Sequence, residues 1–378
     1  MSKILSFIII FLLFGCKVDT GEIVKIESNG KLTKVADTNS SEREEIIFNN
    51  KKTYNKDDMI GQLMCVGINS NTLDNDLKNI IDKYKPGSFI LFNRNIKSTN
   101  QLKRLTSDIK KYYVEKGYIK PFIFVDQEGG RVDRLGKIEK KINSASWYCA
   151  KSNAKKYVED LNYRLSKYGI DSPLCPILDT NASNAKGAIG DRSFSGNYNK
   201  VCEFGKAVLN EFKNTNMISV AKHFPGHGAT TVDSHYNLPV INKTYEQLKQ
   251  TDLLPFESNY EFMDGIMVAH ILVPSVDSVP ASLSQKWMKI IRQNGFNGLI
   301  LSDDLTMGAL KKYGEIKDRF VQFIDAGGDI GLICHYKDLS SIYNEIKKID
   351  EKRINESFER ILKLKNEKIK WKWFFKWV

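Results

Sequence analysis

Residues 217–235 read MISVAKHFPGHGATTVDSH, and this stretch contains the pattern from which the fold can be predicted. The apolar run 217–221 is typical of a short buried strand. Pro225, Gly226 and Gly228 then make continuation of that strand, or of any helix, unfavourable. The stretch also holds three of the five histidines of the chain. A rigid strand therefore ends in a polar, glycine-containing loop, which is a common way to present reactive groups.

The same unit recurs along the chain from about residue 60. Short apolar runs alternate with amphipathic helical stretches. The runs are apolar on both faces, as is typical of buried parallel strands. Eight runs are strand candidates: 62–67, 88–92, 122–125, 172–178, 218–221, 266–269, 299–301 and 330–333. Eight alternating units in roughly 300 residues predict an α/β fold, a single (β/α)8 TIM-type barrel. A doubly wound open sheet is the alternative, but no Gly-x-Gly-x-x-Gly follows an early strand.

The N-terminal residues form a separate unit. Lys3 precedes an apolar run, 4–14, that is too short to span a bilayer, and Gly15 stands directly before Cys16. This pattern resembles a bacterial lipoprotein signal, with an uncleaved signal anchor as the alternative. We therefore expect residues 1–16 to be a signal peptide with Cys16 lipidated, 17–52 a flexible tether and 53–378 the barrel with a basic aromatic tail. The protein would then sit on the bacterial cell membrane, lipid-anchored and extracytoplasmic.

The net charge of +12 raises the question of an anionic partner. The lysines are spread along the chain and no basic-aromatic motif accompanies them, so a nucleic-acid partner is not expected. The C-terminal end, KWKWFFKWV at 370–378, does concentrate lysine and tryptophan, as segments at a membrane interface do. The alternative is that these rings pack back on the barrel. The cysteines after Cys16 are widely spaced, which indicates buried thiols rather than a disulfide framework.

The polar motifs fall at the predicted strand exits, where a barrel of this kind builds its active site. They are DQEGGRVDR at 126–134, DRSF at 191–194, the stretch 222–235, His270, SDDLTM at 302–307 and Cys334-His335. A carboxylate facing a Lys/His/Asp cluster suits covalent catalysis with a separate proton donor, as in retaining glycosidases. His235 is the best donor, because imidazole titrates near neutral pH and Asp233 is near enough in the sequence to orient the ring.

Together these motifs resemble those of glycoside hydrolase family 3 β-N-acetylglucosaminidases, in family order over about residues 57–335. The resemblance implies that Asp303 is the nucleophile and forms a glycosyl-enzyme intermediate, with His235 as acid/base paired with Asp233. It implies that N-acetylglucosamine is held by Asp126, Arg134, Arg192, Lys222 and His223. It implies no metal or organic cofactor. The expected partner is a carbohydrate, a peptidoglycan fragment with a terminal β-linked N-acetylglucosamine.

Other interpretations stay open from the residues alone. Asp304 could replace Asp303 as the reactive carboxylate, while Glu128 is expected to brace a turn and His227 to fix one. The histidines of the stretch 222–235, with Asp233, could bind zinc, although no helical HExxH is present. A family 3 phosphorylase, with phosphate in place of water as acceptor, and a lipoprotein that binds cell-wall sugar without catalysis are further alternatives.

Overall fold

The computed structural model describes residues 54–181, 189–229 and 237–374, and the short strands β1 (Ile8–Ile9), β2 (Ile23–Ile26) and β3 (Leu32–Val35). The chain divides into two compact units, Met1–Tyr54 and Asn55–Val378. In the first unit, β2 pairs antiparallel with both β1 and β3. Cys16 and most of the predicted signal peptide and tether lie outside the described residues, so their roles stay predictions.

The second unit is built on a seven-stranded parallel sheet in the order β6-β5-β4-β12-β11-β10-β9. The strands are β4 (Met64–Gly67), β5 (Ser88–Leu91), β6 (Phe122–Val125), β9 (Val220–Phe224), β10 (Gly265–Val268), β11 (Leu299–Asp304) and β12 (Ile330–Ile333). Every strand residue is buried except the last two of β11, Asp303 and Asp304. The continuous apolar runs in the sequence therefore correspond to strands covered on both faces.

The predicted closed barrel of eight strands is wrong. The segment 172–178, expected as the fourth strand, is not a strand, and it contributes only isolated bridges, Phe124↔Ser172 and Ile177↔Lys222. Pro173 and Pro176 have no N–H to donate to a ladder, and Leu174 has a left-handed φ of 49°. The sheet is consequently a seven-stranded half-barrel whose edge strands, β6 and β9, are joined by an irregular segment.

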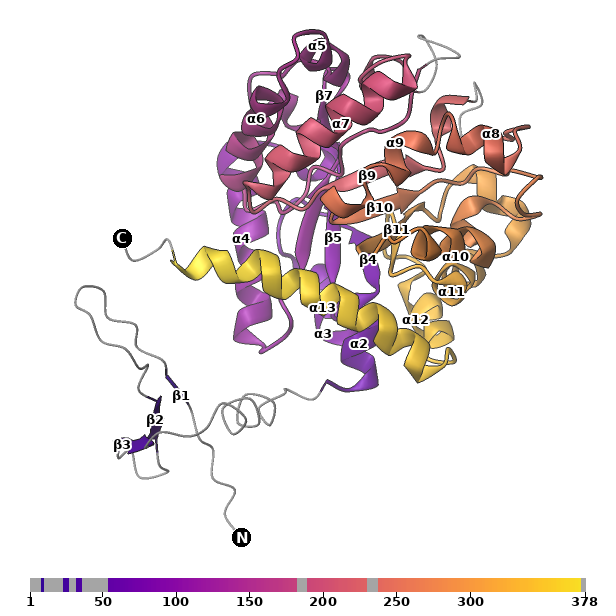
Figure 1. The fold of residues 1–378 in the computed structure, drawn as a ribbon. Coiled ribbons are helices and arrows are strands. Elements are labelled where there is room, and N and C mark those ends of the chain that lie inside the picture. The colour runs from indigo at the N-terminus through magenta and orange to yellow at the C-terminus, as the bar shows by residue number, and fades with distance from the viewer. Residues whose placement is uncertain are drawn as a thin grey trace. The chain divides into compact units, whose positions relative to one another are not determined.

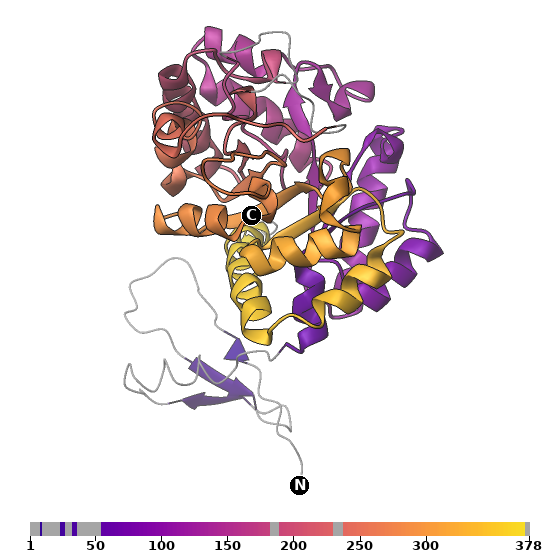
Figure 2. The same ribbon diagram turned by 90° about the vertical axis from the view of Figure 1, so that its right-hand side faces the viewer.

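Helices surround this sheet (Figures 1 and 2). The longer helices are α3 (Asn75–Tyr84), α4 (Thr99–Glu115), α6 (Ala154–Ser166), α7 (Tyr198–Lys213), α10 (Gln285–Gln293), α11 (Ile316–Ala326), α12 (Leu339–Ile346) and α13 (Glu351–Phe374). The shorter helices are α2 (Lys56–Gln62), α5 (Ala145–Ala150), α8 (Tyr245–Lys249) and α9 (Leu254–Glu257), and β7 (Gln127–Gly129) pairs with β8 (Val132–Asp133). Capping side chains such as Asp74, Ser98 and Ser284 accept a backbone N–H in the first turn of their helices and so define where they begin. None of the helices in the described part of the chain is long and apolar enough to cross a membrane.

Helix α13 runs across the amino ends of the strands (Figure 1). The buried Lys365 ammonium donates to Gln62 Oε1 at 2.6 Å and to the carbonyl oxygens of Gly87 and Lys120, both at 2.8 Å. Gly87 lies just before β5, and Lys120 lies two residues before β6. The helix therefore closes this end of the sheet, and the carboxyl ends of the strands remain available for a site.

Candidate active site

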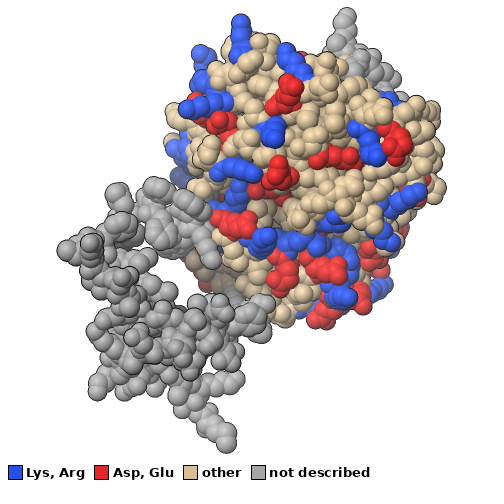
Figure 3. Space-filling model, viewed as in Figure 1, with Lys and Arg blue, Asp and Glu red and all other residues tan. Residues whose placement is uncertain are grey.

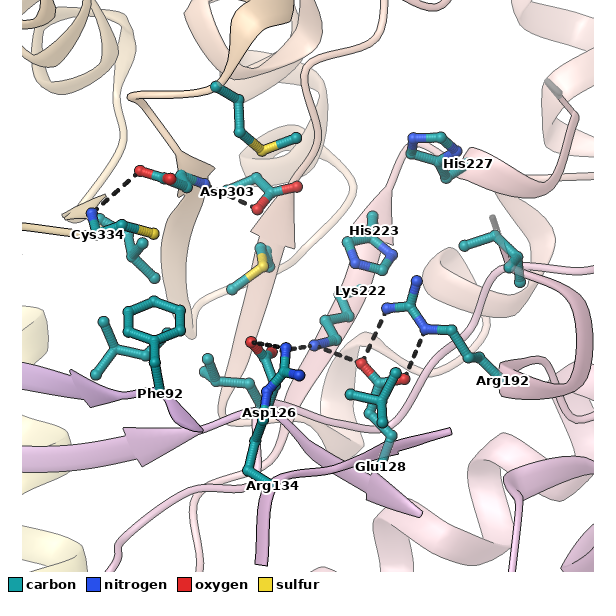
Figure 4. Close-up of a pocket in the computed structure, with 18 residues that line it drawn as sticks. Phe92, Asp126, Glu128, Arg134, Arg192, Lys222, His223, His227, Asp303 and Cys334 are labelled. Atoms are coloured by element: carbon teal, nitrogen blue, oxygen red, sulfur yellow. Dashed lines mark hydrogen bonds and ion pairs between the residues drawn. The ribbon is translucent and has the colours of Figure 1, made fainter. Parts of the chain in front are cut away.

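A cavity of about 260 Å³ lies at the carboxyl ends of the strands (Figure 4). This is slightly below the range of about 300–1,000 Å³ typical of sites for drug-sized ligands, so it suits one small group. The polar residues that line it are Asp126, Glu128, Arg134, Arg192, Lys222, His223, His227, Asp303 and Asp304. They come from the sequence motifs predicted at the strand exits. All the sugar-binding residues implied by the resemblance are among them.

An ionic cluster forms one wall of the cavity, and Figure 4 shows its contacts. Lys222 Nζ, from β9, lies 2.8 Å from Asp126 Oδ1 and 2.9 Å from Glu128 Oε1. Arg192 Nε donates to Glu128 Oε2 at 2.7 Å, and Arg192 Nη2 donates to Glu128 Oε1 at 2.9 Å. Arg134 Nη2 lies 3.9 Å from Asp126 Oδ2. Glu128, which the sequence suggested only as a turn brace, is thus the carboxylate that joins the buried Lys222 to the partly buried Arg192.

The members of this cluster hold one another in their charged forms. Burial alone would raise the pKa of Glu128, but Arg192 and Lys222 outweigh it and place that pKa well below its usual range. Burial also opposes the charge of Lys222, yet Asp126 and Glu128 raise the pKa of this lysine above its ordinary value. Charged groups fixed by mutual contacts are pre-oriented donors and acceptors, and charge-assisted hydrogen bonds are the stronger ones.

Asp303 and Asp304, at the end of β11, have different surroundings. Asp303 Oδ1 accepts the backbone N–H of Asp304 at 2.8 Å, and within the described ranges no other donor contacts its carboxylate. Asp304 instead accepts from the Thr306 N–H at 3.0 Å, the Thr306 hydroxyl at 2.6 Å and the Cys334 N–H at 3.2 Å. The geometry therefore favours Asp303 over Asp304 as the reactive carboxylate, since Asp304 is engaged in holding the loop.

Two histidines, His270 and His223, affect the ionisation of Asp303. Burial would raise the pKa of Asp303, but His270, His223 and the N–H of Asp304 lower it below its ordinary value, so the carboxylate is ionised at neutral pH. His270 Nε2 lies 2.8 Å from the carbonyl oxygen of Asp304, and its Nδ1 lies 2.8 Å from the Ser282 hydroxyl. A carbonyl can only accept, so Nε2 carries a hydrogen. Burial lowers the pKa of His270, which indicates a neutral residue that fixes the turn after Asp303.

His223 lines the cavity from the end of β9. Its Nδ1 lies 2.6 Å from Asp179 Oδ2, and its ring packs edge-on against His227 with the ring centres 6.0 Å apart. Asp179 follows the irregular segment 172–178, and it is not among the site residues predicted from the sequence. The available signal was its place, because it follows an apolar run as the other site residues do.

The proposed acid/base pair, Asp233 and His235, lies outside the described residues, and its role stays a prediction. The zinc alternative depends on the same two residues. Within residues 54–181, 189–229 and 237–374, no group of three or more histidine, cysteine, aspartate or glutamate side chains is arranged to hold a metal ion.

Comparison with known proteins identifies the family. The model of the glycosyl hydrolase family 3 N terminal domain matches residues 56–364. The β-hexosaminidase of Nitrosomonas eutropha is 35% identical over 289 residues, which cover 71% of this chain and 80% of that protein.

Solved structures agree with this family. A family 3 β-N-acetylglucosaminidase from a Paenibacillus species is similar with a TM-score of 0.79 at 28% identity, over 84% of this chain and 63% of that chain. This chain thus spans less than two thirds of that structure. NagZ from Neisseria gonorrhoeae, solved with N-trifluoroacetyl-D-glucosamine, has a TM-score of 0.69 at 32% identity, over 80% of this chain and 89% of that chain. With most of its length matched and the expected motifs gathered in one cavity, the chain belongs to glycosyl hydrolase family 3 and is a glycoside hydrolase.

Proposed function

We propose that the protein is a retaining β-N-acetylglucosaminidase that removes terminal β-linked N-acetylglucosamine from peptidoglycan fragments. The observation that carries the proposal is the ionised Asp303 carboxylate, held on one oxygen by the Asp304 N–H, at a cavity large enough for one sugar ring. The choice of sugar is supported by the relatives named β-hexosaminidase and by NagZ, whose structure holds an N-acetylglucosamine analogue.

In the proposed reaction, Asp303 attacks the anomeric carbon while His235 protonates the leaving oxygen. The bond to the aglycone breaks and a glycosyl-enzyme intermediate forms on Asp303. His235 then takes a proton from water, which attacks the same carbon and releases the sugar with its configuration retained. Asp233 would orient the imidazole of His235 and stabilise its protonated form.

The residues of the cavity wall would hold the sugar and favour its transition state. Asp126, Arg134, Arg192, Lys222 and His223 supply donors and acceptors for its hydroxyl and amide groups. The lining includes four carboxylates, of Asp126, Glu128, Asp303 and Asp304, against three cations, of Arg134, Arg192 and Lys222. Counted without the histidines, these groups give an excess of one negative charge. A positively charged, oxocarbenium-like transition state is stabilised by such a field.

The test uses an aryl N-acetyl-β-glucosaminide and intact-protein mass spectrometry. Wild-type protein should release the aryl group, and a substrate slowed by fluorine on the sugar ring should leave one glycosyl unit attached to the peptide that contains Asp303. Asp303→Asn should neither turn over the substrate nor become labelled. Absence of turnover by the wild-type protein at every pH tested would refute the proposal. Loss of turnover on addition of a chelator would favour the zinc alternative. Formation of a sugar phosphate when phosphate is added would identify a phosphorylase.

We also propose that the enzyme is lipid-anchored through Cys16 and acts outside the cytoplasm. The sequence pattern before Cys16 supports this. Cys16→Ala should move the protein from the membrane to the soluble fraction, and an unchanged membrane fraction would contradict the anchor. A second contact could come from the tail at 370–378. Deletion of that tail from protein without the anchor should then weaken liposome binding, and unchanged binding would exclude this role.

A further inference from the structure

A buried carboxylate lies behind His223, and the proposed mechanism does not use it. Asp179 is 1% exposed. It follows Leu178, whose N–H donates to the carbonyl oxygen of Lys222 at 2.8 Å, so the aspartate reaches β9 where His223 meets the cavity. An ionised carboxylate is costly to bury unless hydrogen bonds compensate for the lost water. Its bonds therefore indicate what the residue does.

Asp179 receives hydrogen bonds on both oxygens. Its Oδ2 accepts the backbone N–H of His223 at 3.0 Å and lies 2.6 Å from His223 Nδ1. Its Oδ1 accepts the backbone N–H of His227 at 2.6 Å. Burial would raise the pKa of Asp179, but His223 and His227 lower it below its usual value, so the carboxylate is ionised and only accepts. The hydrogen between the two side chains therefore belongs to His223 Nδ1.

We propose that Asp179 is a positioning residue of the active site, which holds His223 in its Nδ1–H form and presents Nε2 to the sugar. In this tautomer a neutral Nε2 accepts a hydrogen bond from a hydroxyl group, whereas in the other tautomer it would donate one. The carboxylate thus determines both the orientation of the ring and the kind of hydrogen bond it offers. The sugar as ligand rests on the function proposed above, whereas the tautomer does not.

The same carboxylate fixes the chain that leads to the predicted acid/base pair. His227 begins the short helix η4 (His227–Ala229), and its N–H is the one bound by Asp179 Oδ1. The next residue, Gly228, packs so closely that an added Cβ would lie 1.5 Å from the carbonyl oxygen of Thr180. Asp179 and Thr180 therefore hold the start of the segment whose sequence contains Asp233 and His235.

Asp179→Asn tests the proposal because an amide cannot reproduce these bonds. Fixed backbone N–H groups face both carboxylate oxygens, so the NH₂ group of asparagine must oppose one of them. If it faces His223, the ring must accept at Nδ1 and carry its hydrogen at Nε2. If it faces His227, the start of η4 loses its acceptor. Either orientation disturbs the site while side-chain size is kept.

The first measurement is the tautomer of His223, from two-bond ¹H–¹⁵N correlation spectra of the imidazole nitrogens at about pH 8, where an ordinary histidine is neutral. Five histidines in the chain make the assignment practicable, with His223→Gln to identify the signal. We expect an Nδ1–H pattern in the wild-type protein. A wild-type ring protonated only at Nε2 would overturn the proposal. The wild-type spectrum decides even where the variant fails to fold.

The second measurement is kcat/KM on the aryl N-acetyl-β-glucosaminide. We expect Asp179→Asn to lower kcat/KM on the order of 100-fold, because a misplaced catalytic site slows the reaction by about this factor. Asp329→Asn is the matched control. Asp329 lies just before β12, is as buried as Asp179, and also accepts a backbone N–H, that of Ile300 at 2.9 Å. The control should lower the melting temperature but leave kcat/KM within about twofold and the His223 signals unchanged, since remote sites act independently. Equal losses in the two variants would reduce Asp179 to a structural role. If the wild-type protein were inactive but its His223 ring carried the hydrogen on Nδ1, the proposed function would be refuted, whereas the positioning of His223 by Asp179 would stand.

Discussion

Replacement of Glu128 by glutamine gives a quantitative test of the ionic cluster. Glu128 is 1% exposed, and its carboxylate contacts Arg192 at 2.7 and 2.9 Å and Lys222 at 2.9 Å. Glutamine keeps the size of the side chain and removes its charge, which takes away the carboxylate that pairs with both Lys222 and Arg192. Removing one partner of a buried ion pair typically costs about 3–5 kcal/mol. We expect Glu128→Gln to lower the free energy of unfolding by that amount.

The assay is urea unfolding followed by circular dichroism at pH 7. Glu115→Gln is the control, because Glu115 is paired with Lys111 at 3.6 Å on the surface and is 57% exposed. Such a pair contributes at most about 1 kcal/mol. If Glu128→Gln cost no more than the control, the cluster would not act as a buried charge network.

The pH dependence of the Glu128 contribution has a defined sign. The pKa of Glu128 is lowered in the folded protein from an ordinary value of 4.5, because Arg192 and Lys222 outweigh the effect of burial. The unfolded state therefore takes up protons first as the pH falls, and the contribution is complete above 4.5 and declines below it. The stability difference between wild-type protein and Glu128→Gln should accordingly shrink on acidification below about pH 4.5. A difference that stayed constant down to pH 3 would contradict this assignment of charge.

Three further predictions concern the base of the sheet and the loop after β9. Burial lowers the pKa of Lys365 from 10.5 to about 7 in the folded protein. Between these two pH values the unfolded chain therefore binds more protons than the folded protein. The free energy of unfolding should accordingly fall by on the order of 5 kcal/mol as the pH drops from 10.5 to 7. Lys365→Met should flatten this slope in urea midpoints, and an unchanged slope would contradict the pKa shift. Gly228→Ala should reduce kcat/KM on the order of 100-fold, because its methyl group would lie 1.5 Å from a carbonyl oxygen of Thr180; activity close to wild type would show that the contact relaxes. His235→Ala should spare substrates with good leaving groups far more than natural ones, and equal losses would count against His235 as the acid.

The sequence was informative wherever chemistry follows a buried apolar run. Asp126, Lys222 and Asp303 all come at such positions, and the structure brings them to one cavity. Parallel strands end at one edge of a sheet, so this convergence follows from local patterns once the strands are recognised. The ionic contacts of Glu128, in contrast, could not be predicted from the local sequence. They depend on Arg192, which lies 64 residues further along the chain, and no local pattern predicts that contact.

The closure of the sheet was mispredicted for a local reason. Apolar character alone made 172–178 look like a strand, but Pro173 and Pro176 remove two donors from any ladder. Two prolines within seven residues were the signal that the prediction should have weighted. The error thus came from reading hydrophobicity without counting the N–H groups that a strand requires.

This irregular segment is also what makes the site possible. The N–H of Lys222 donates to the carbonyl oxygen of Pro176 at 3.1 Å, and the Leu178 N–H donates to the carbonyl oxygen of Lys222 at 2.8 Å. These two bonds tie the segment to β9 as far as Lys222, and the next residue, Asp179, then accepts the N–H of His223 at 3.0 Å. Asp179 can receive two further bonds, from the His223 ring and the His227 N–H, because the chain has already left strand geometry. A regular strand would direct alternate side chains to opposite faces and engage its backbone in a ladder. The departure from the predicted barrel and the positioning of His223 therefore have the same physical origin.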